Sequence, residues 1–249
     1  MRAVLRAELF KQRTTQTGRS LFGAMLCLVL FAVVLHGALL PTENIDGDAE
    51  QLTAVFGWGA LMSALFAALL GALSITSEFR HGTIRPTLLA TPARGLVIVA
   101  KVLATMLIGA GFGFVAAIIA ASAGAVALRA RSVDVRLDGG DYALLIAGGV
   151  IAASLWAALG VGLGAIVRNQ VPALVGICAW LLFVENLLVG DFRLIGDVGR
   201  LLPGAAGQAL SGQNQGSLVS PGVGLVLLVL YAGITTVAGY VAISRSDID

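Results

Sequence analysis

The run LTAVFGWGALMSALFAALLGALSI, residues 52–75, has no charged side chain and leads into the connector SEFRHGTIRPTLLATPARG, residues 77–95. An uncharged run of this length is enough to cross the roughly 30 Å hydrocarbon layer of a membrane as a helix. The connector instead gathers acidic, basic, threonine and proline residues over a short distance. Together they predict a membrane helix followed by an extramembrane segment with a chemistry of its own.

The composition of the whole chain agrees with a membrane protein. Hydrophobic residues make up 58% and charged residues 12% of the chain, whereas charged residues reach roughly 25% in soluble domains. The 32 glycines also fit, because small residues allow membrane helices to approach closely. A net charge of +2 is too small to favour nucleic acid as a partner.

Uncharged runs recur along the chain and predict an all-α integral membrane protein that forms a single transmembrane domain over residues 1–249. The six predicted spans are residues 20–40, 52–75, 102–128, 142–167, 171–190 and 218–244.

Two segments outside the spans are expected to be partly helical. Residues 1–19 form an N-terminal segment whose arginines cluster on one side of a helix. In the connector 191–217, apolar residues recur at helical spacing up to Leu202, and Pro203 with Gly204 is expected to break that pattern. We expect a short helix at the outer face there.

The distribution of Lys and Arg predicts the orientation. With the N-terminus inside, the inner segments carry eleven basic residues and the outer segments five. Because cytoplasmic loops are enriched in Lys and Arg, both termini and the loop 76–101 are predicted to be cytoplasmic, in a multi-pass protein of the cell membrane.

The glycine motifs at residues 109–113 and 160–164 do not indicate a nucleotide site. They lie inside predicted spans and follow no strand, so close helix packing explains them better. The chain contains no Gly-Lys dipeptide and hence no phosphate-binding loop of the GxxxxGK[ST] type. Its two His and two Cys lack the spacing of metal ligands. We therefore predict neither a catalytic nor a metal site.

Glu185 is the one acidic residue within a predicted span. A carboxylate there is costly unless it faces protein, water or a partner. Two roles for this residue stay open. Glu185 could hydrogen-bond to Asn186 or a neighbouring helix near the interface, or Glu185 and Asn186 could contribute to a substrate path.

The connector at residues 77–95 also has two interpretations. It could be an ordinary basic inner loop, or a short amphipathic element that docks a soluble protein, with Pro86 starting a helical turn. The cationic N-terminal segment is a further possible partner for Glu78.

The stretch EFRHGTIRPTLLATPARGLVIVAK (residues 78–101) resembles the loop after the second span in type-2 permeases of ATP-binding cassette (ABC) exporters. Those permeases typically show an acidic residue, an aromatic residue, Arg-x-Gly-Thr, a Leu-Leu pair, Pro-x-x-Arg and a Lys that opens the third span. The matching positions are Glu78, Phe79, Arg80, Gly82, Thr83, Leu88, Leu89, Pro92 and Lys101. Arg94 departs from the pattern, because it follows the proline by two residues instead of three.

The resemblance implies that this loop contains a coupling helix that docks on a separate cassette ATPase. The residues implied in coupling are Glu78, Phe79, Arg80, His81, Gly82, Thr83, Arg85, Leu88 and Leu89. It also implies a second permease, identical or paralogous, ATP and Mg²⁺ bound by the partner ATPase, contacts with membrane lipids, and outward movement of a hydrophobic or amphipathic substrate such as a drug or antibiotic, a lipid or a peptide.

Two other classes of function stay open on the sequence alone. One is an ATP-independent secondary carrier, which usually needs several acidic residues within its spans. The other is a non-transporting membrane anchor or immunity protein.

Overall fold

The computed structural model describes residues 1–83, 94–188, 196–213 and 218–245. Within these residues the chain is helical and forms no strand. Five helical segments are long and apolar enough to cross a membrane: Gln16–Leu39, Asp48–Arg80, Gly95–Ala130, Gly139–Val167 and Pro221–Arg245. The predicted all-α membrane architecture is therefore confirmed.

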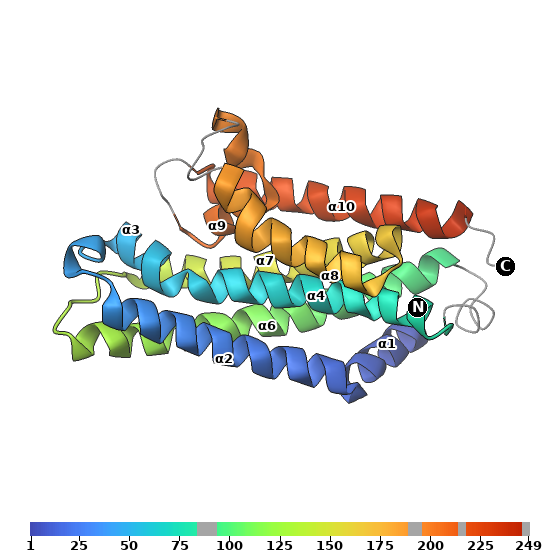
Figure 1. The fold of residues 1–249 in the computed structure, drawn as a ribbon, viewed down its shortest axis with the longest axis horizontal. Helices are drawn as coiled ribbons and strands as arrows, with labels where there is room; N and C mark the ends of the chain where they lie inside the picture. The colour runs from blue at the N-terminus through green and yellow to red at the C-terminus, as the bar shows by residue number, and fades with distance from the viewer. Residues whose placement is uncertain (84–93, 189–195, 214–217, 246–249) are drawn as a thin grey trace.

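The helices follow one another along the chain with few interruptions (Figure 1). They are α1 (Arg2–Thr14), α2 (Gln16–Leu39), α3 (Asp48–Gln51), α4 (Trp58–Arg80), α6 (Arg94–Ala130), α7 (Gly139–Val167), α8 (Gln170–Ala179), α9 (Pro203–Leu210) and α10 (Pro221–Arg245). Shorter turns are the 3₁₀ turns Thr42–Asn44 and Gly196–Leu201 and the π-helical turns Leu52–Phe56 and Trp180–Val184.

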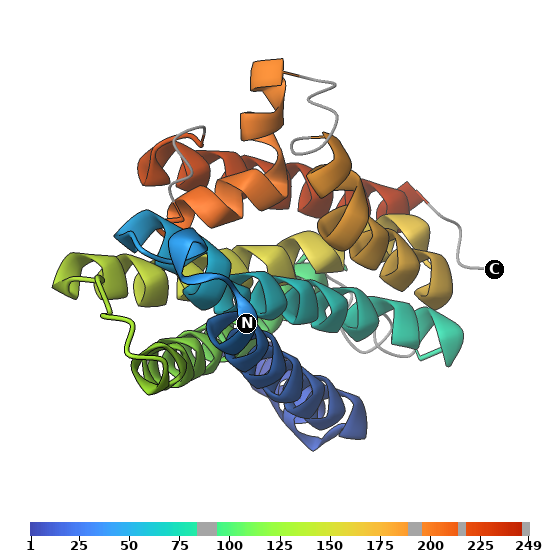
Figure 2. The ribbon, with the colours of Figure 1, turned by 60° about the vertical axis from the view of Figure 1, so that its left-hand side comes forward.

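The long helices run side by side, with α7 in contact with α4, α6 and α10 (Figures 1 and 2). The N-terminus and the C-terminal end of α10 lie at one end of the bundle, here named the termini end, and α3 lies at the opposite end, named the far end (Figure 1). Most of α4 and α7 is buried, whereas little of α2 and α10 is buried. The exposed side chains of these outer helices include Phe31, Val226 and Ile234. Such an apolar surface suits lipid and would be unfavourable in water.

Small residues let α7 approach its neighbours closely. A Cβ atom added at Gly160 would lie 2.1 Å from the carbonyl oxygen of Ala68 on α4. A Cβ atom at Gly162 would lie 2.4 Å from the carbonyl carbon of Thr235 on α10. The predicted packing role therefore fits Gly160 and Gly162. In the other glycine motif, a Cβ atom would lie 2.8 Å from the carbonyl oxygen of Ala153 at Gly109 and 2.5 Å from that of Gly149 at Gly113, whereas Gly111 has no atom within 4 Å of such a Cβ.

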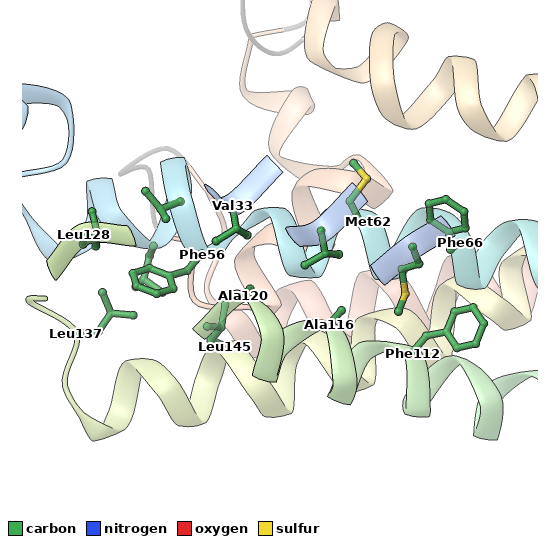
Figure 3. Packing of buried hydrophobic residues seen from close by; sticks show 14 of the residues in the cluster. Val33, Phe56, Met62, Phe66, Phe112, Ala116, Ala120, Leu128, Leu137 and Leu145 are labelled. Atoms are coloured by element: carbon green, nitrogen blue, oxygen red, sulfur yellow. The ribbon is translucent and has the colours of Figure 1, made fainter. Parts of the chain in front are cut away.

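Bulky apolar side chains fill the layer between α2, α4 and α6 (Figure 3). Phe56 is fully buried, and its ring lies edge-on to Tyr142 at a centroid distance of 6.3 Å. Phe22 and Phe112 pack with ring centroids 5.2 Å apart. This layer joins α2 to the central helices and continues towards the far end.

The predicted count of six spans is not confirmed. In place of the fifth predicted span, residues 171–190, the apolar segment Gln170–Val184 is shorter than the other five. Helical backbone continues from Val184 to Leu188, so at 1.5 Å per residue the described helical stretch is about 28 Å long, close to the roughly 30 Å of the hydrocarbon layer. Residues 189 and 190 lie outside the described part of the chain.

Helices extend into both ends of the predicted loop between the second and third spans. The loop was expected over residues 76–101, but α4 continues to Arg80 and α6 begins at Arg94. The buried charges of this stretch, Glu78 and Lys101, lie within these helices and are paired with each other.

The helical pattern predicted to break at Pro203 and Gly204 does end there, but the same proline also begins a further helix. A 3₁₀ turn ends at Leu201, and Pro203 then starts α9 as one of its first residues. Proline suits this place because its missing N–H would have no partner within the helix and its fixed φ already matches helical geometry.

We expect Gly160→Val to lower the free energy of unfolding by about 1–3 kcal/mol, because the added side chain collides with the backbone of α4. Gly111→Val is the matched control, since the same side chain there enters open space. Reversible unfolding in mixed detergent micelles measures both variants. Equal stabilities of the two variants would contradict this packing role of Gly160.

Candidate functional site

Four charged side chains meet at the termini end of the bundle, and we name them the charged cluster: Glu8, Lys11, Glu78 and Lys101. Lys101 Nζ lies 2.7 Å from Glu8 Oε2 and 3.0 Å from Glu78 Oε1. Lys11 also donates a hydrogen bond to Glu78 Oε1. The cluster thus connects α1, α4 and α6, which bring together residues up to 93 positions apart.

The charged cluster is largely removed from solvent. The side chains of Glu78 and Lys101 are each 1% exposed and that of Glu8 is 9% exposed, whereas Lys11 remains 44% exposed. Two carboxylates balance two ammonium groups, so the cluster carries no formal net charge. Removing one partner of a buried ion pair is far more costly than its modest net contribution to stability, because the mate is left uncompensated.

The amphipathic character of α1 explains how it reaches the cluster. Glu8 and Gln12 are one helical turn apart and are the two buried residues of α1, whereas Phe10 is 71% exposed. The face of α1 that contacts α6 is therefore polar. It supplies Lys101 with a second carboxylate, in addition to Glu78 of α4, at a buried place where an ammonium group needs acidic partners.

The end of α4 is set by a glycine in the predicted coupling motif. Gly82 has a φ of +66°, and Thr83 N–H donates to the carbonyl of Glu78 while Gly82 N–H donates to that of Phe79. This pair of bonds is the Schellman motif, which stops a helix at a left-handed residue. The motif ends α4 directly after the charged cluster, and the exposed residues from Arg80 to Thr83 follow.

The predicted coupling residues fall into three groups. Glu78 is buried in the charged cluster, and Phe79 is half-buried against the apolar residues around Ile75. Exposed at the termini end are Arg80, His81, Gly82 and Thr83. Outside the described residues lie Arg85, Leu88 and Leu89.

Arg80 also bridges two helices. Its Nη1 donates a 3.2 Å hydrogen bond to Gln170 Oε1 at the start of α8. The ring nitrogen Nδ1 of the next residue, His81, lies 2.7 Å from the carbonyl oxygen of Ser77. The exposed end of α4 is thus held by local bonds and by α8.

Glu185 binds a helix terminus near the far end. Its Oε1 accepts a 2.6 Å hydrogen bond from Ala205 N–H, and its Oε2 accepts bonds of 3.0 Å from Gly204 N–H and from the indole N–H of Trp180. The first N–H groups of a helix lack partners within it and carry partial positive charge. A carboxylate that is only 5% exposed is therefore stabilised there, and it ties the Trp180–Glu185 segment to α9.

Asn186 does not take part in this contact. It is exposed, and its amide donates to the carbonyl of Leu182 in the preceding turn. The sequence left Asn186 and a neighbouring helix as possible hydrogen-bond partners of Glu185. The structure shows the bond to a helix, α9, and not to Asn186.

Sequence reasoning missed Glu8 as a functional candidate and anticipated Lys11 only as part of a cationic segment. The available signal in the sequence was Lys101, directly before the predicted span 102–128. A cation at the start of a membrane span requires an acidic partner. Glu8 is the one acidic residue of the N-terminal segment 1–19.

A family model described as "ABC-2 family transporter protein" matches residues 9–195, which include most of the charged cluster and Glu185. No curated protein matches the chain.

We expect Lys101→Met to lower the free energy of unfolding by about 3–5 kcal/mol, because it leaves Glu8 without its cation in a buried site. The double variant Lys101→Met with Glu8→Gln should recover much of the lost free energy of unfolding, because the uncompensated charge of Glu8 is removed. Reversible unfolding of parent, single and double variants measures the coupling. Additive effects of the two substitutions would show that Glu8 and Lys101 do not interact.

We expect Glu185→Ala to loosen α9, because it removes the acceptor of three hydrogen bonds and leaves buried N–H groups unpaired, at about 1–3 kcal/mol for each group. Glu185→Gln keeps one acceptor oxygen and should fall between parent and Glu185→Ala. Protection of the Gly204 and Ala205 amides against hydrogen exchange measures the effect. Asn186→Ala is the control, and protection that drops equally in that variant would contradict the assignment.

Proposed function

The chain belongs to the ABC-2 family of transporter proteins, and from this membership we propose that it is the membrane-spanning permease of an ATP-driven exporter. It is a multi-pass membrane protein and a transport component. The proposal adds a separate cassette ATPase that binds ATP and Mg²⁺ and drives a hydrophobic or amphipathic substrate outward. The observation that best supports this proposal is the exposed C-terminal end of α4. The charged cluster holds this end in place through Glu78, two residues before the exposed Arg80.

The proposed orientation places the termini end in the cytoplasm, where an ATPase would be available. It rests on the excess of Lys and Arg in the segments at that end. Arg80 and His81 are then displayed towards the partner from the last turn of α4 and its cap. The exposed guanidinium of Arg80 suits charge-assisted hydrogen bonds across such an interface.

The charged cluster supports a mechanical role for α1, α4 and α6. Glu78 is too deeply buried to contact the ATPase, so we assign it as a positioning residue that holds the end of α4 through Lys11 and Lys101. Force applied by the ATPase to the exposed end of α4 would then move the three connected helices together. Packed and hydrogen-bonded elements transmit such displacements without deforming continuously.

At the far end, Glu185 supports a link between this movement and the substrate path. It joins the segment after α8 to α9, and α9 packs against α7 and α10. In the proposed mechanism Glu185 positions α9 along that path. The apolar exposed faces of α2 and α10 are available to lipid and to a second permease.

The experiment is substrate-stimulated ATP hydrolysis and export in vesicles that contain the permease and its ATPase. We expect Arg80→Ala to weaken retention of the ATPase on a column by about tenfold or more, because truncating a charged interface residue typically costs about 2–5 kcal/mol. Hydrolysis should no longer respond to substrate, while membrane insertion stays normal.

Two controls separate docking from other effects. Gln170→Ala removes the bond that Arg80 makes within the chain but keeps the cation, so docking should persist. Arg136→Ala removes an exposed ion pair with Asp46 at the far end. We expect this variant to retain the ATPase and to export substrate like the parent. If Arg80→Ala retains its ATPase and exports like the parent, docking at the end of α4 is refuted.

A further inference from the structure

A cavity of about 410 Å³ opens at the termini end beside the charged cluster. Its lining comes from α1, the first turn of α2, the second half of α4 and Gln170 at the start of α8. Its volume lies in the range of small-molecule sites, roughly 300–1,000 Å³. Arg80, His81 and Thr83 at the end of α4 also line the cavity, so it adjoins the proposed docking surface.

The cavity has an apolar part and a polar part. Leu70 and Leu73 line it from the interior of α4, about 10–15 Å along the helix axis from Arg80. Polar side chains line the part nearer the end of α4, among them Gln12, Glu78 and the exposed cations Lys11 and Arg80. The polarity thus runs in the same direction as in a membrane leaflet, with the polar end at the surface and the apolar end towards the middle.

Three buried polar atoms in the wall of this cavity make no hydrogen bond to any described residue: Glu78 Oε2, Gln12 Oε1 and Gln12 Nε2. Glu78 is 1% and Gln12 is 8% exposed. Buried polar groups are almost always paired with protein, water or a ligand, because an unpaired one is costly. These atoms leave two acceptors and one donor group of the lining residues unpaired, and an occupant of the cavity reaches them when neighbouring side chains move aside, because the atoms have almost no accessible surface.

The charges around these atoms select the chemistry of the occupant. The unpaired oxygen of Glu78 would repel a purely anionic group, and Lys11 and Arg80 would repel a purely cationic one. A zwitterionic group satisfies both sets, with N–H donors towards Glu78 Oε2 and Gln12 Oε1 and an anionic part towards Lys11, Arg80 and Gln12 Nε2. Charge-assisted hydrogen bonds of this kind are the stronger ones.

We propose that this cavity binds the aminoethyl-phosphate headgroup of a membrane phospholipid, with Gln12 and Glu78 recognising the ammonium and Leu70 and Leu73 contacting the start of an acyl chain. The occupant is a lipid and not a soluble aminoalkyl phosphate because the cavity continues into an apolar part. This assignment does not depend on the proposed ATPase, since the site is built from this chain alone.

The test is native mass spectrometry of the full chain released from vesicles that contain equal amounts of phosphatidylethanolamine, phosphatidylcholine and phosphatidylglycerol. We expect phosphatidylethanolamine to be retained preferentially on the parent. Phosphatidylcholine has the same charges but no N–H donor, so equal retention of the two would overturn the proposal. Preferential retention of phosphatidylglycerol would also overturn it, because the basic residues alone would then explain binding.

Gln12→Leu should reduce this retention about tenfold, the size expected when hydrogen bonds in a buried site are lost. Gln16→Leu is the matched control, since Gln16 is exposed and does not line the cavity, and it should retain the lipid like the parent. Unchanged retention in Gln12→Leu would overturn the role of Gln12. The comparison of the three lipids on the parent holds even if that variant folds poorly.

Soluble glycerophosphoethanolamine separates the two sources of this headgroup. We expect it not to displace the lipid at equal concentration, because it lacks the acyl chain that Leu70 and Leu73 contact. Displacement at equal concentration would overturn the assignment to a membrane lipid.

Discussion

The buried ammonium of Lys101 is the constraint on which the termini end of this protein depends. An amine in an apolar bundle is tolerated only when carboxylates accept its hydrogen bonds, and Lys101 obtains one from α1 and one from α4. The requirement brings the N-terminal helix against α6 and holds the last turn of α4 in place. It also accounts for the polar inner face of α1, which would be unusual for a helix packing on an apolar bundle.

The same physical rule operates near the opposite end with a different partner. Glu185 has no cation within the contacts that the structure describes, and its charge is met by the N-terminal N–H groups of α9 and by an indole N–H. A helix N-terminus is a suitable site for an anion because its N–H groups are free and its dipole is favourable. Each end of the bundle thus contains a buried carboxylate whose hydrogen bonds join separate segments.

Between these two polar sites the bundle is held by close packing of small residues. Gly160 and Gly162 bring α7 against α4 and α10 at distances that no side chain would allow. Tight packing of this kind makes relative sliding of helices discrete, since interdigitated surfaces have few alternative arrangements. A permease built this way can transmit a displacement from the exposed end of α4 through connected helices, and the lipid cavity lies directly beside that connection.

The sequence by itself determined the properties that depend on local composition. Uncharged runs predicted the all-α membrane architecture, and the glycine motif at residues 160–164 predicted close helix packing, because hydropathy and small-residue spacing act within one helix or between neighbours. The coupling motif also predicted an exposed segment after the second span, although the Schellman motif at Gly82 places the end of α4 later than expected. What only the tertiary structure decided was the pairing of charges. Lys101 and Glu8 are 93 residues apart and Glu185 and Ala205 are 20 apart, so no periodicity links them. The start of α9 at Pro203 and the short segment Gln170–Val184 likewise became visible only once the helices were packed, because the partners that satisfy their backbone and side-chain groups come from elsewhere in the chain.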